Sequence, residues 1–571
     1  MSKKVWIISS VASVLVFAAL SFFILSSQYL KNSEFSAVDE FFYAINAGYA
    51  FSQNVQLVSG LGFIYDLING LSFKIIERLD LGMDKIIFIA SLIFSFFLIA
   101  IWALIRVWTQ FKIPFLVLLA LVELSGISEF AFFRIFNIDI IWSSFYHSNL
   151  WALLLLQMIL SAMIFDQKES FKTLKNKDIC FLSIIQVLFL YIFFNYKMNF
   201  FVVSCALSAI PFMIWPIKKS IRYFLLIVIL LIVLNVLTTF IFGYDYIQYI
   251  SSLKIWFEQR MSHPVVMQIE PHVHSMAILS FFTLCGIMIL AQISKSFENG
   301  GCQELSIKKR QIQEKVIGSV KNFISLLTFK SAIQNLIFIF IFILIVYILT
   351  RSNASTFWRL FFFPLIIGFF VFIKHKYIKP LLLIFCLLYI LHFDIIYSRS
   401  FIKSNGDGWQ EVVYRNVNPR REIRFFAHPQ KFHERGQILA QKHGGWFINH
   451  DEEDDEAINY FDDILDFYKK VGIKSDDKLI IGTHVNFAPF IVNGTYPDNS
   501  LIFHSNGDVG PYLRWREFDG ANIFIIPKRE RLQYILTPYE AEFYMRQYIA
   551  ERAKDFEIVY ETPYFVFYKR K

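Results

Sequence analysis

The sequence contains little charge and little cysteine. Only 18% of its 571 residues are Asp, Glu, Lys or Arg, whereas soluble domains carry about a quarter. A soluble enzyme is therefore excluded as a description of the whole chain. All five cysteines precede residue 398, and none has the spacing of metal ligands, so we expect neither a disulfide framework nor a zinc site. After residue 397 there is no Walker loop, nucleophile elbow or glycine-rich dinucleotide motif, which excludes those chemistries there.

Apolar residues make up 56% of the chain, including 66 Phe, and the mean hydropathy is +0.49. These values are typical of a polytopic α-helical membrane protein. A basic start at Lys3 and Lys4 precedes the first apolar run, which we expect to be retained as a helix. About eleven runs are long enough to cross roughly 30 Å of hydrocarbon, namely Val5–Ser27, 86–108, 114–134, 150–165, 179–195, 198–216, 222–243, 275–293, 334–350, 357–373 and 380–397.

Charge is distributed unevenly and sets the orientation. The first 397 residues hold 31 Lys and Arg against 20 Asp and Glu, whereas residues 398–571 hold 24 against 26. The basic excess therefore belongs to the membrane part, and nucleic-acid binding is not expected. With the N-terminus in the cytoplasm, the alternate loops that also become cytoplasmic are basic. These loops are Arg106–Lys112, Lys168–Lys177, Lys218–Arg222, Lys308–Arg310 and Lys374–Lys379.

Two parts follow from this pattern. Residues 1–397 form the membrane part, and an odd number of spans places residues 398–571 on the outer face as a periplasmic α/β domain with its own core. Turn sequences such as Asn493-Gly494 separate its expected elements. We expect strands at Lys478–Ile481, Ala521–Ile526 and Tyr560–Tyr568, and helices at Ala457–Val471 and Tyr539–Ala553.

The first outer segment, residues 28–85, carries the clearest local signal. Ser36 is a capping residue, and Asp39 and Glu40 follow in the first turn of a predicted helix. An apolar stripe continues through Ile45 and Tyr49, so we expect this helix to lie in the interface plane, followed by a second one around 62–77. On local pattern alone, the two acids either stabilise the helix N-terminus or take part in chemistry, and both interpretations remain open.

The order of these features resembles that of the GT-C glycosyltransferases. One helix, a long outer loop with an acid at the start of a juxtamembrane helix, many further spans and an outer C-terminal domain are shared with protein O-mannosyltransferases, aminoarabinose transferases and bacterial arabinofuranosyltransferases. The resemblance implies that Asp39 is the catalytic carboxylate, with Glu40 adjacent as the alternative. Residues 60–65, Gly-Leu-Gly-Phe-Ile-Tyr, are similar to a stretch that many bacterial members carry, although the usual proline is absent.

Other outer segments supply candidate substrate-binding residues. Some members of the superfamily hold a divalent cation through acids in the first two outer loops and others use none, so metal dependence stays open. Basic groups suit the donor phosphate, and the two histidines near position 273, together with Glu270 or His263, are alternatively zinc ligands. The candidates are Arg134 and Asp139 in the second outer segment, Lys197 in a short turn, and Arg260, His272 and His274 in the 244–274 loop.

The expected function is transfer of a sugar from a polyprenyl-phosphate donor to a glycan, lipid or protein acceptor on the outer face of a bacterial inner membrane. Asp39 would act as general base with inversion at the anomeric centre. The alternative is a flippase or transporter of lipid-linked sugars, which would place ionisable residues inside the membrane. The spans contain few such residues, chiefly Glu123 and Glu129. The identities of the sugar and the acceptor are left open.

Overall fold

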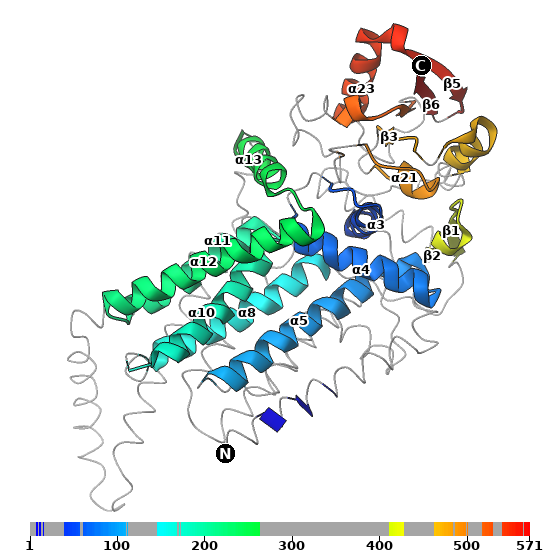
Figure 1. Cartoon of the computed structure of the whole chain (residues 1–571). Helices are drawn as coiled ribbons and strands as arrows, with labels where there is room; N and C mark the ends of the chain where they lie inside the picture. Colours follow the sequence, from blue (N-terminus) through cyan, green and yellow to red (C-terminus); the bar gives the residue numbers. More distant parts are fainter. Residues whose placement is uncertain are drawn as a thin grey trace, which may run out of the picture.

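The computed structural model (Figure 1) describes helical and sheet regions of the chain. The described residues are 7–8, 11–12, 15, 39–57, 61–109, 111, 113, 145–167, 171, 173–262, 410–427, 462–474, 476–482, 486–497, 500, 517–528, 539–563 and 565–571. Within them, helices predominate in the first half and a four-stranded sheet lies near the C-terminus.

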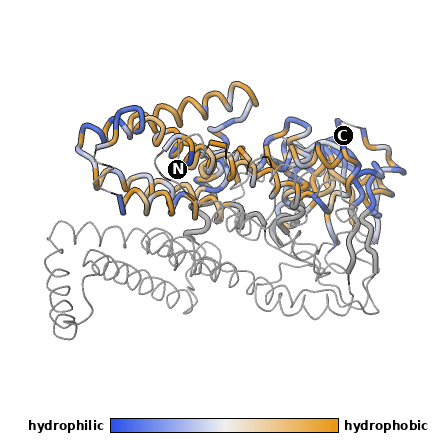
Figure 2. The backbone as a smooth tube through the Cα atoms, turned by 90° about the horizontal axis from the view of Figure 1, so that it is seen from below, coloured by the Kyte–Doolittle hydropathy of each residue, from blue (hydrophilic) through white to orange (hydrophobic). Residues whose placement is uncertain are grey.

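Among the residues that the structure describes, three helices are long and apolar enough to cross a membrane: Ile89–Trp108 within α5 (Ile86–Trp108), α10 (Asn176–Phe194) and α12 (Ile217–Phe242). They coincide with three of the predicted spans, which confirms apolar membrane-type helices there. Beside them lie α8 (Phe145–Asp166) and α11 (Met198–Ser208), whose apolar stretches are shorter. The first predicted span is described only in fragments, and the spans predicted at 114–134 and after residue 274 lie outside the described residues. Figure 2 shows apolar residues along these helices and hydrophilic residues at the turns.

Loops predicted to be cytoplasmic meet at one end of these helices. The indole Nε1 of Trp102 donates to the carbonyl of Ile113 over 3.1 Å. Trp215 donates in the same way to Phe171 over 2.8 Å, and the two rings stack at 4.6 Å. Lys219 Nζ donates to the carbonyl of Leu174 over 3.0 Å. The rings of Phe111 and Phe171 lie 6.2 Å apart. Residues near 110, 172 and 217 therefore form one contiguous end.

At the opposite end lie two shorter helices, α3 (Asp39–Ser52) and α4 (Phe63–Leu79), followed by a 3-10 turn, η1 (Met83–Lys85), that leads into α5 (Ile86–Trp108). Both helices were expected in the first outer segment. Glycines allow them to approach closely, because a Cβ on Gly48 would lie 2.8 Å from the carbonyl oxygen of Asn69. A Cβ on Gly70 would lie 2.2 Å from the ring of Phe51. The predicted apolar stripe of α3 is buried, with Ile45 and Tyr49 inside the core.

The C-terminal sheet has the order β3-β4-β6-β5. β3 (Leu479–Ile481) is parallel to β4 (Ile523–Pro527), and β6 (Phe565–Arg570) is antiparallel to both β4 and β5 (Phe556–Glu561). Successive side chains alternate between faces. Leu479, Ile481, Ile523 and Ile525 belong to the core that continues into the helices, whereas Ile480, Phe524 and Ile526 pack with Met545 and Tyr548 of α23 (Tyr539–Glu551).

The predicted C-terminal elements are largely present. The single strand expected at Tyr560–Tyr568 is instead the end of β5 and most of β6, because Thr562 and Pro563 form a turn in which Thr562 Oγ1 accepts from the amide of Phe565 over 2.9 Å. The helix expected at Ala457–Val471 is described from residue 462 and ends as a π-helix, Tyr468–Gly472. A two-stranded ladder, β1 (Gln410–Tyr414) with β2 (Ile423–Ala427), precedes the sheet.

Candidate functional site

Helix α3 is described from Asp39 onward. The structure describes only the backbone of Asp39 and Glu40, so their place in the first turn, where negative charge is favourable to the helix dipole, stays a prediction. The same holds for Arg260 near the end of α13 (Tyr246–Ser262). Four predicted site residues lie outside the described residues: Arg134, Asp139, His272 and His274.

Three segments that the sequence assigns to the outer face converge in what we term the outer junction, residues 61–66, 194–197 and 244–249. The amide of Ile64 donates to the carbonyl of Asn195 over 2.6 Å. Leu61 and Lys197 form an isolated antiparallel bridge. The third segment is held by Tyr246, which donates to Asn195 Oδ1 over 2.6 Å. The convergence brings Lys197 next to the glycine-containing stretch that the sequence singled out.

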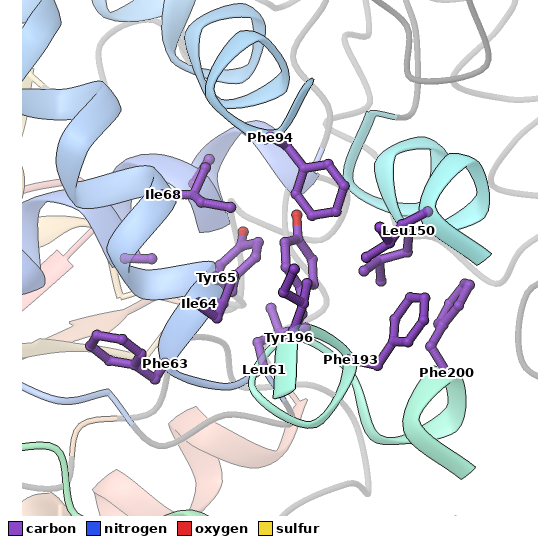
Figure 3. Close-up of a cluster of buried hydrophobic side chains, with 14 of the residues drawn as sticks. Leu61, Phe63, Ile64, Tyr65, Ile68, Phe94, Leu150, Phe193, Tyr196 and Phe200 are labelled. Carbon is purple, nitrogen blue, oxygen red and sulfur yellow. The ribbon is translucent and has the colours of Figure 1, made fainter. Parts of the chain in front are cut away.

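Aromatic rings line this junction (Figure 3). Tyr65 and Tyr196 meet edge to face at 5.5 Å, and Phe94 packs against Tyr196 at 5.7 Å. Phe63 contacts Tyr244 at 5.3 Å, which extends the aromatic surface to the third segment. Tyrosines combine an apolar ring with a polar end and suit a boundary between hydrocarbon and water.

Lys197 lies in the short turn between α10 and α11, at the N-cap of α11. Its side chain is half-buried, and its amide donates to the carbonyl of Phe193 over 2.8 Å. The expected short turn is therefore present, and its backbone is fixed by α10 and by Leu61. Contact of the lysine with a donor phosphate remains a prediction.

Asp66 is a buried carboxylate that the sequence analysis did not select. Its side chain belongs to α4, and Oδ1 has no hydrogen-bond partner. Burial raises the pKa of Asp66 well above its ordinary value, so the neutral acid is favoured. Burial also raises the pKa of Tyr244, and the nearby Asp66 charge adds to that rise. The sequence did contain a signal for this residue: Asp66 is the single acid in the apolar run Phe63–Ile68, which begins directly after Gly62.

Residues 246–262, expected as part of an outer loop, form helix α13. Asp245 starts this helix, because its Oδ1 accepts from the amides of Ile247 and Gln248 over 2.8 and 3.1 Å. Gln56 ties the helix start to the segment between α3 and α4 by exchanging two hydrogen bonds with the backbone of Asp245, of 3.1 and 2.8 Å. Arg260 is thus carried by a helix and not by an irregular loop.

No three His, Cys, Asp or Glu side chains in the described parts of the chain are placed so that they could hold a metal ion. Comparison with protein-family models gives no match, and neither curated proteins nor solved structures give one.

Proposed function

We propose that this protein is an integral membrane glycosyltransferase of the GT-C type. It would transfer a sugar from a polyprenyl phosphate to a glycan, lipid or protein acceptor. The observation that carries the proposal is the position of α3, whose first described residue is Asp39 and which packs with α4 at the end of the helices where α5 begins. A carboxylate at that end would meet a lipid-linked donor at the bilayer surface.

In the proposed reaction, Asp39 removes the proton from an acceptor hydroxyl while the acceptor oxygen forms a bond to the anomeric carbon. The bond between that carbon and the phosphate oxygen breaks, and polyprenyl phosphate leaves with the electron pair. The anomeric centre is inverted. Lys197, Arg134 and Arg260 are the proposed partners of the departing phosphate, since positive groups stabilise charge as it develops.

The proposed topology has about eleven spans, a cytoplasmic N-terminus and an outer α/β domain at residues 398–571, in a bacterial inner membrane. Two observations support it. Segments near 62, 196 and 245, all predicted to be outer, lie together at one end of the helices. Segments near 110, 172 and 217, all predicted to be cytoplasmic, lie together at the other.

The test is release of polyprenyl phosphate from synthetic polyprenyl-phosphate sugars, with membrane extract as acceptor. We expect release by the wild type and a loss of at least about 100-fold for Asp39→Asn, within the usual contribution of a general base. Glu40→Gln is the matched control on the same helical turn. Equal rates for wild type and Asp39→Asn would refute the assignment of Asp39, and a loss confined to Glu40→Gln would move it to Glu40.

A flippase for lipid-linked sugars is the second candidate, and one observation favours it. Gln157 of α8 donates to Gln186 Oε1 of α10 over 3.0 Å and to Ser208 Oγ over 3.3 Å, all within the buried bundle. Gln157 Oε1 and Gln186 Nε2 have no hydrogen-bond partner. Polar groups inside a membrane bundle commonly mark a substrate path. Movement of the donor across liposome membranes without release of polyprenyl phosphate would support this function and contradict the transferase.

A further inference from the structure

Helix α3 presents one polar row to the C-terminal part of the chain. Asn46 and Tyr49 of α3, together with Gln53 in the turn directly after the helix, follow one another at helical spacing and lie on one side. Each bonds to the segment 486–496, which we term the docking segment. Asn46 Nδ2 donates to the carbonyl of Asn486 over 3.2 Å. Tyr49 and Gln53 both donate to the carbonyl of Gly494, over 2.9 and 2.7 Å. More than 430 positions of sequence separate the partners.

The contact at Asn46 is reciprocal and closed to solvent. Tyr496 donates its hydroxyl to Asn46 Oδ1 over 2.9 Å. Asn46, Asn486 and Tyr496 are each 0% exposed. A buried amide that loses its partners keeps the desolvation cost of its polar atoms, of about 1–3 kcal/mol. A shift of α3 that broke this pairing would therefore cost free energy, so the pairing favours the observed position of the helix.

The docking segment is itself fixed to the sheet. Asn486 Oδ1 accepts from the amide of Ile481 over 3.2 Å, and Asn486 Nδ2 donates to the carbonyl of Leu479 over 3.2 Å. The amide of Leu479 donates to the carbonyl of Thr495 over 3.1 Å. Both ends of the docking segment are thus tied to β3, so α3 is held by a rigid neighbour.

Arg421 also contacts the interface between α3 and the docking segment. Its Nε donates to Glu77 Oε1 of α4 over 2.7 Å, and its guanidinium covers the rings of Tyr49 and Phe73 at 5.1 and 5.4 Å. A further hydrogen bond joins it to Asn493. One side chain therefore contacts α3, α4 and the docking segment.

From these contacts we infer that the docking segment positions the part of α3 that carries Asp39, and that Asn46 and Tyr496 are positioning residues for the reaction proposed above. The inference rests on the proposed function. Asn46 lies seven residues after Asp39, about 10 Å along the helix axis. A tilt of α3 by about 10° about Asn46 would displace Asp39 by about 2 Å. Displacements of this size lower the rate of a catalysed reaction.

The test uses the full-length protein in detergent with Tyr496→Phe, which removes only the hydroxyl. Tyr548→Phe is the control, because Tyr548 is equally buried, donates to Asp519 over 2.6 Å and packs on the other face of the sheet. We expect hydrogen exchange at amides of residues 42–48 to become about tenfold faster in Tyr496→Phe and to stay unchanged in the control. We also expect kcat for polyprenyl phosphate release to fall about tenfold with KM changed less than about twofold.

Asn46→Leu provides a second variant that removes both hydrogen bonds, and a larger increase in exchange is expected. Unchanged exchange in Tyr496→Phe overturns the inference whatever the activity. Faster exchange with unchanged kcat also overturns it, because α3 would then be held without effect on the reaction. If the wild type releases no polyprenyl phosphate, the proposed function fails, while the exchange comparison still decides whether the docking segment holds α3.

Discussion

Gly62 lies against the backbone of Asn195 so closely that a Cβ at residue 62 would stand 2.7 Å from the carbonyl carbon of Asn195. The contact joins the start of α4 to the turn between α10 and α11. It sits beside Lys197 and one helical turn before Asp66, so the packing of a single glycine sets the geometry of the outer junction.

Gly62→Ala is expected to destabilise the protein by about 1–3 kcal/mol, because the added methyl group clashes with backbone atoms and a change of side chain cannot relieve that clash. Thermal unfolding in detergent measures the change. Gly70→Ala is the matched comparison, since the three atoms nearest to its Cβ would all belong to the side chain of Phe51. Adding Phe51→Leu to Gly70→Ala should recover part of the lost stability, because the side chain that meets the new methyl group becomes smaller. Adding Phe51→Leu to Gly62→Ala should recover none of it. Equal rescue of both variants would contradict the backbone clash.

Arg421→Ala should destabilise the protein by about 1–3 kcal/mol, because it leaves Glu77 without its partner and uncovers two buried rings. The Arg421 side chain is 14% exposed. Arg420 is the neighbouring control, with a 3.8 Å pair to Asp80 and a side chain 72% exposed, so Arg420→Ala should leave the unfolding midpoint unchanged. Similar midpoints for the two variants would contradict a specific role of Arg421.

Asp66→Asn should remove a pH-dependent loss of stability. Burial raises the pKa of Asp66 in the folded state, so the folded protein holds a proton that the unfolded chain releases once the pH exceeds about 4. Stability is therefore greatest below that pH and falls as the pH rises through the raised pKa. The gain in melting temperature of Asp66→Asn over wild type should grow across this window. A gain in melting temperature that is independent of pH would contradict a raised pKa of Asp66. The control is Glu557→Gln, at an exposed position.

Membrane orientation can be tested with single cysteines in a cysteine-free variant. Ile247 and Lys218 are both exposed and lie near opposite ends of α12. In intact cells, a membrane-impermeant maleimide should label Ile247→Cys at once and Lys218→Cys only after permeabilisation. The reverse pattern would invert the topology, and labelling of both in intact cells would rule out a crossing by α12.

Much of the described helical region was predictable because the relevant signals are local. Long apolar runs specify α5, α10 and α12 whatever surrounds them, and the apolar stripe through Ile45 and Tyr49 predicts α3. The strands at 479–481 and 523–527 follow from short apolar runs between turn residues. The aromatic-rich run 560–568 was expected to be one strand, but the turn at Thr562 and Pro563 divides it between β5 and β6. A local pattern did not predict this turn.

The sequence by itself determined the apolar helices α5, α10 and α12 and the presence of helices α3 and α4 between the first two apolar runs, because hydropathy and helical periodicity depend on neighbouring residues. Only the tertiary structure decided that Asp66 is buried without a partner at Oδ1, that Gly62 must lack a side chain, and that Asn46 pairs with Tyr496. These properties depend on which distant residues come into contact. A polar residue on an apolar helix has the same local pattern whether it faces water or a partner 450 positions away.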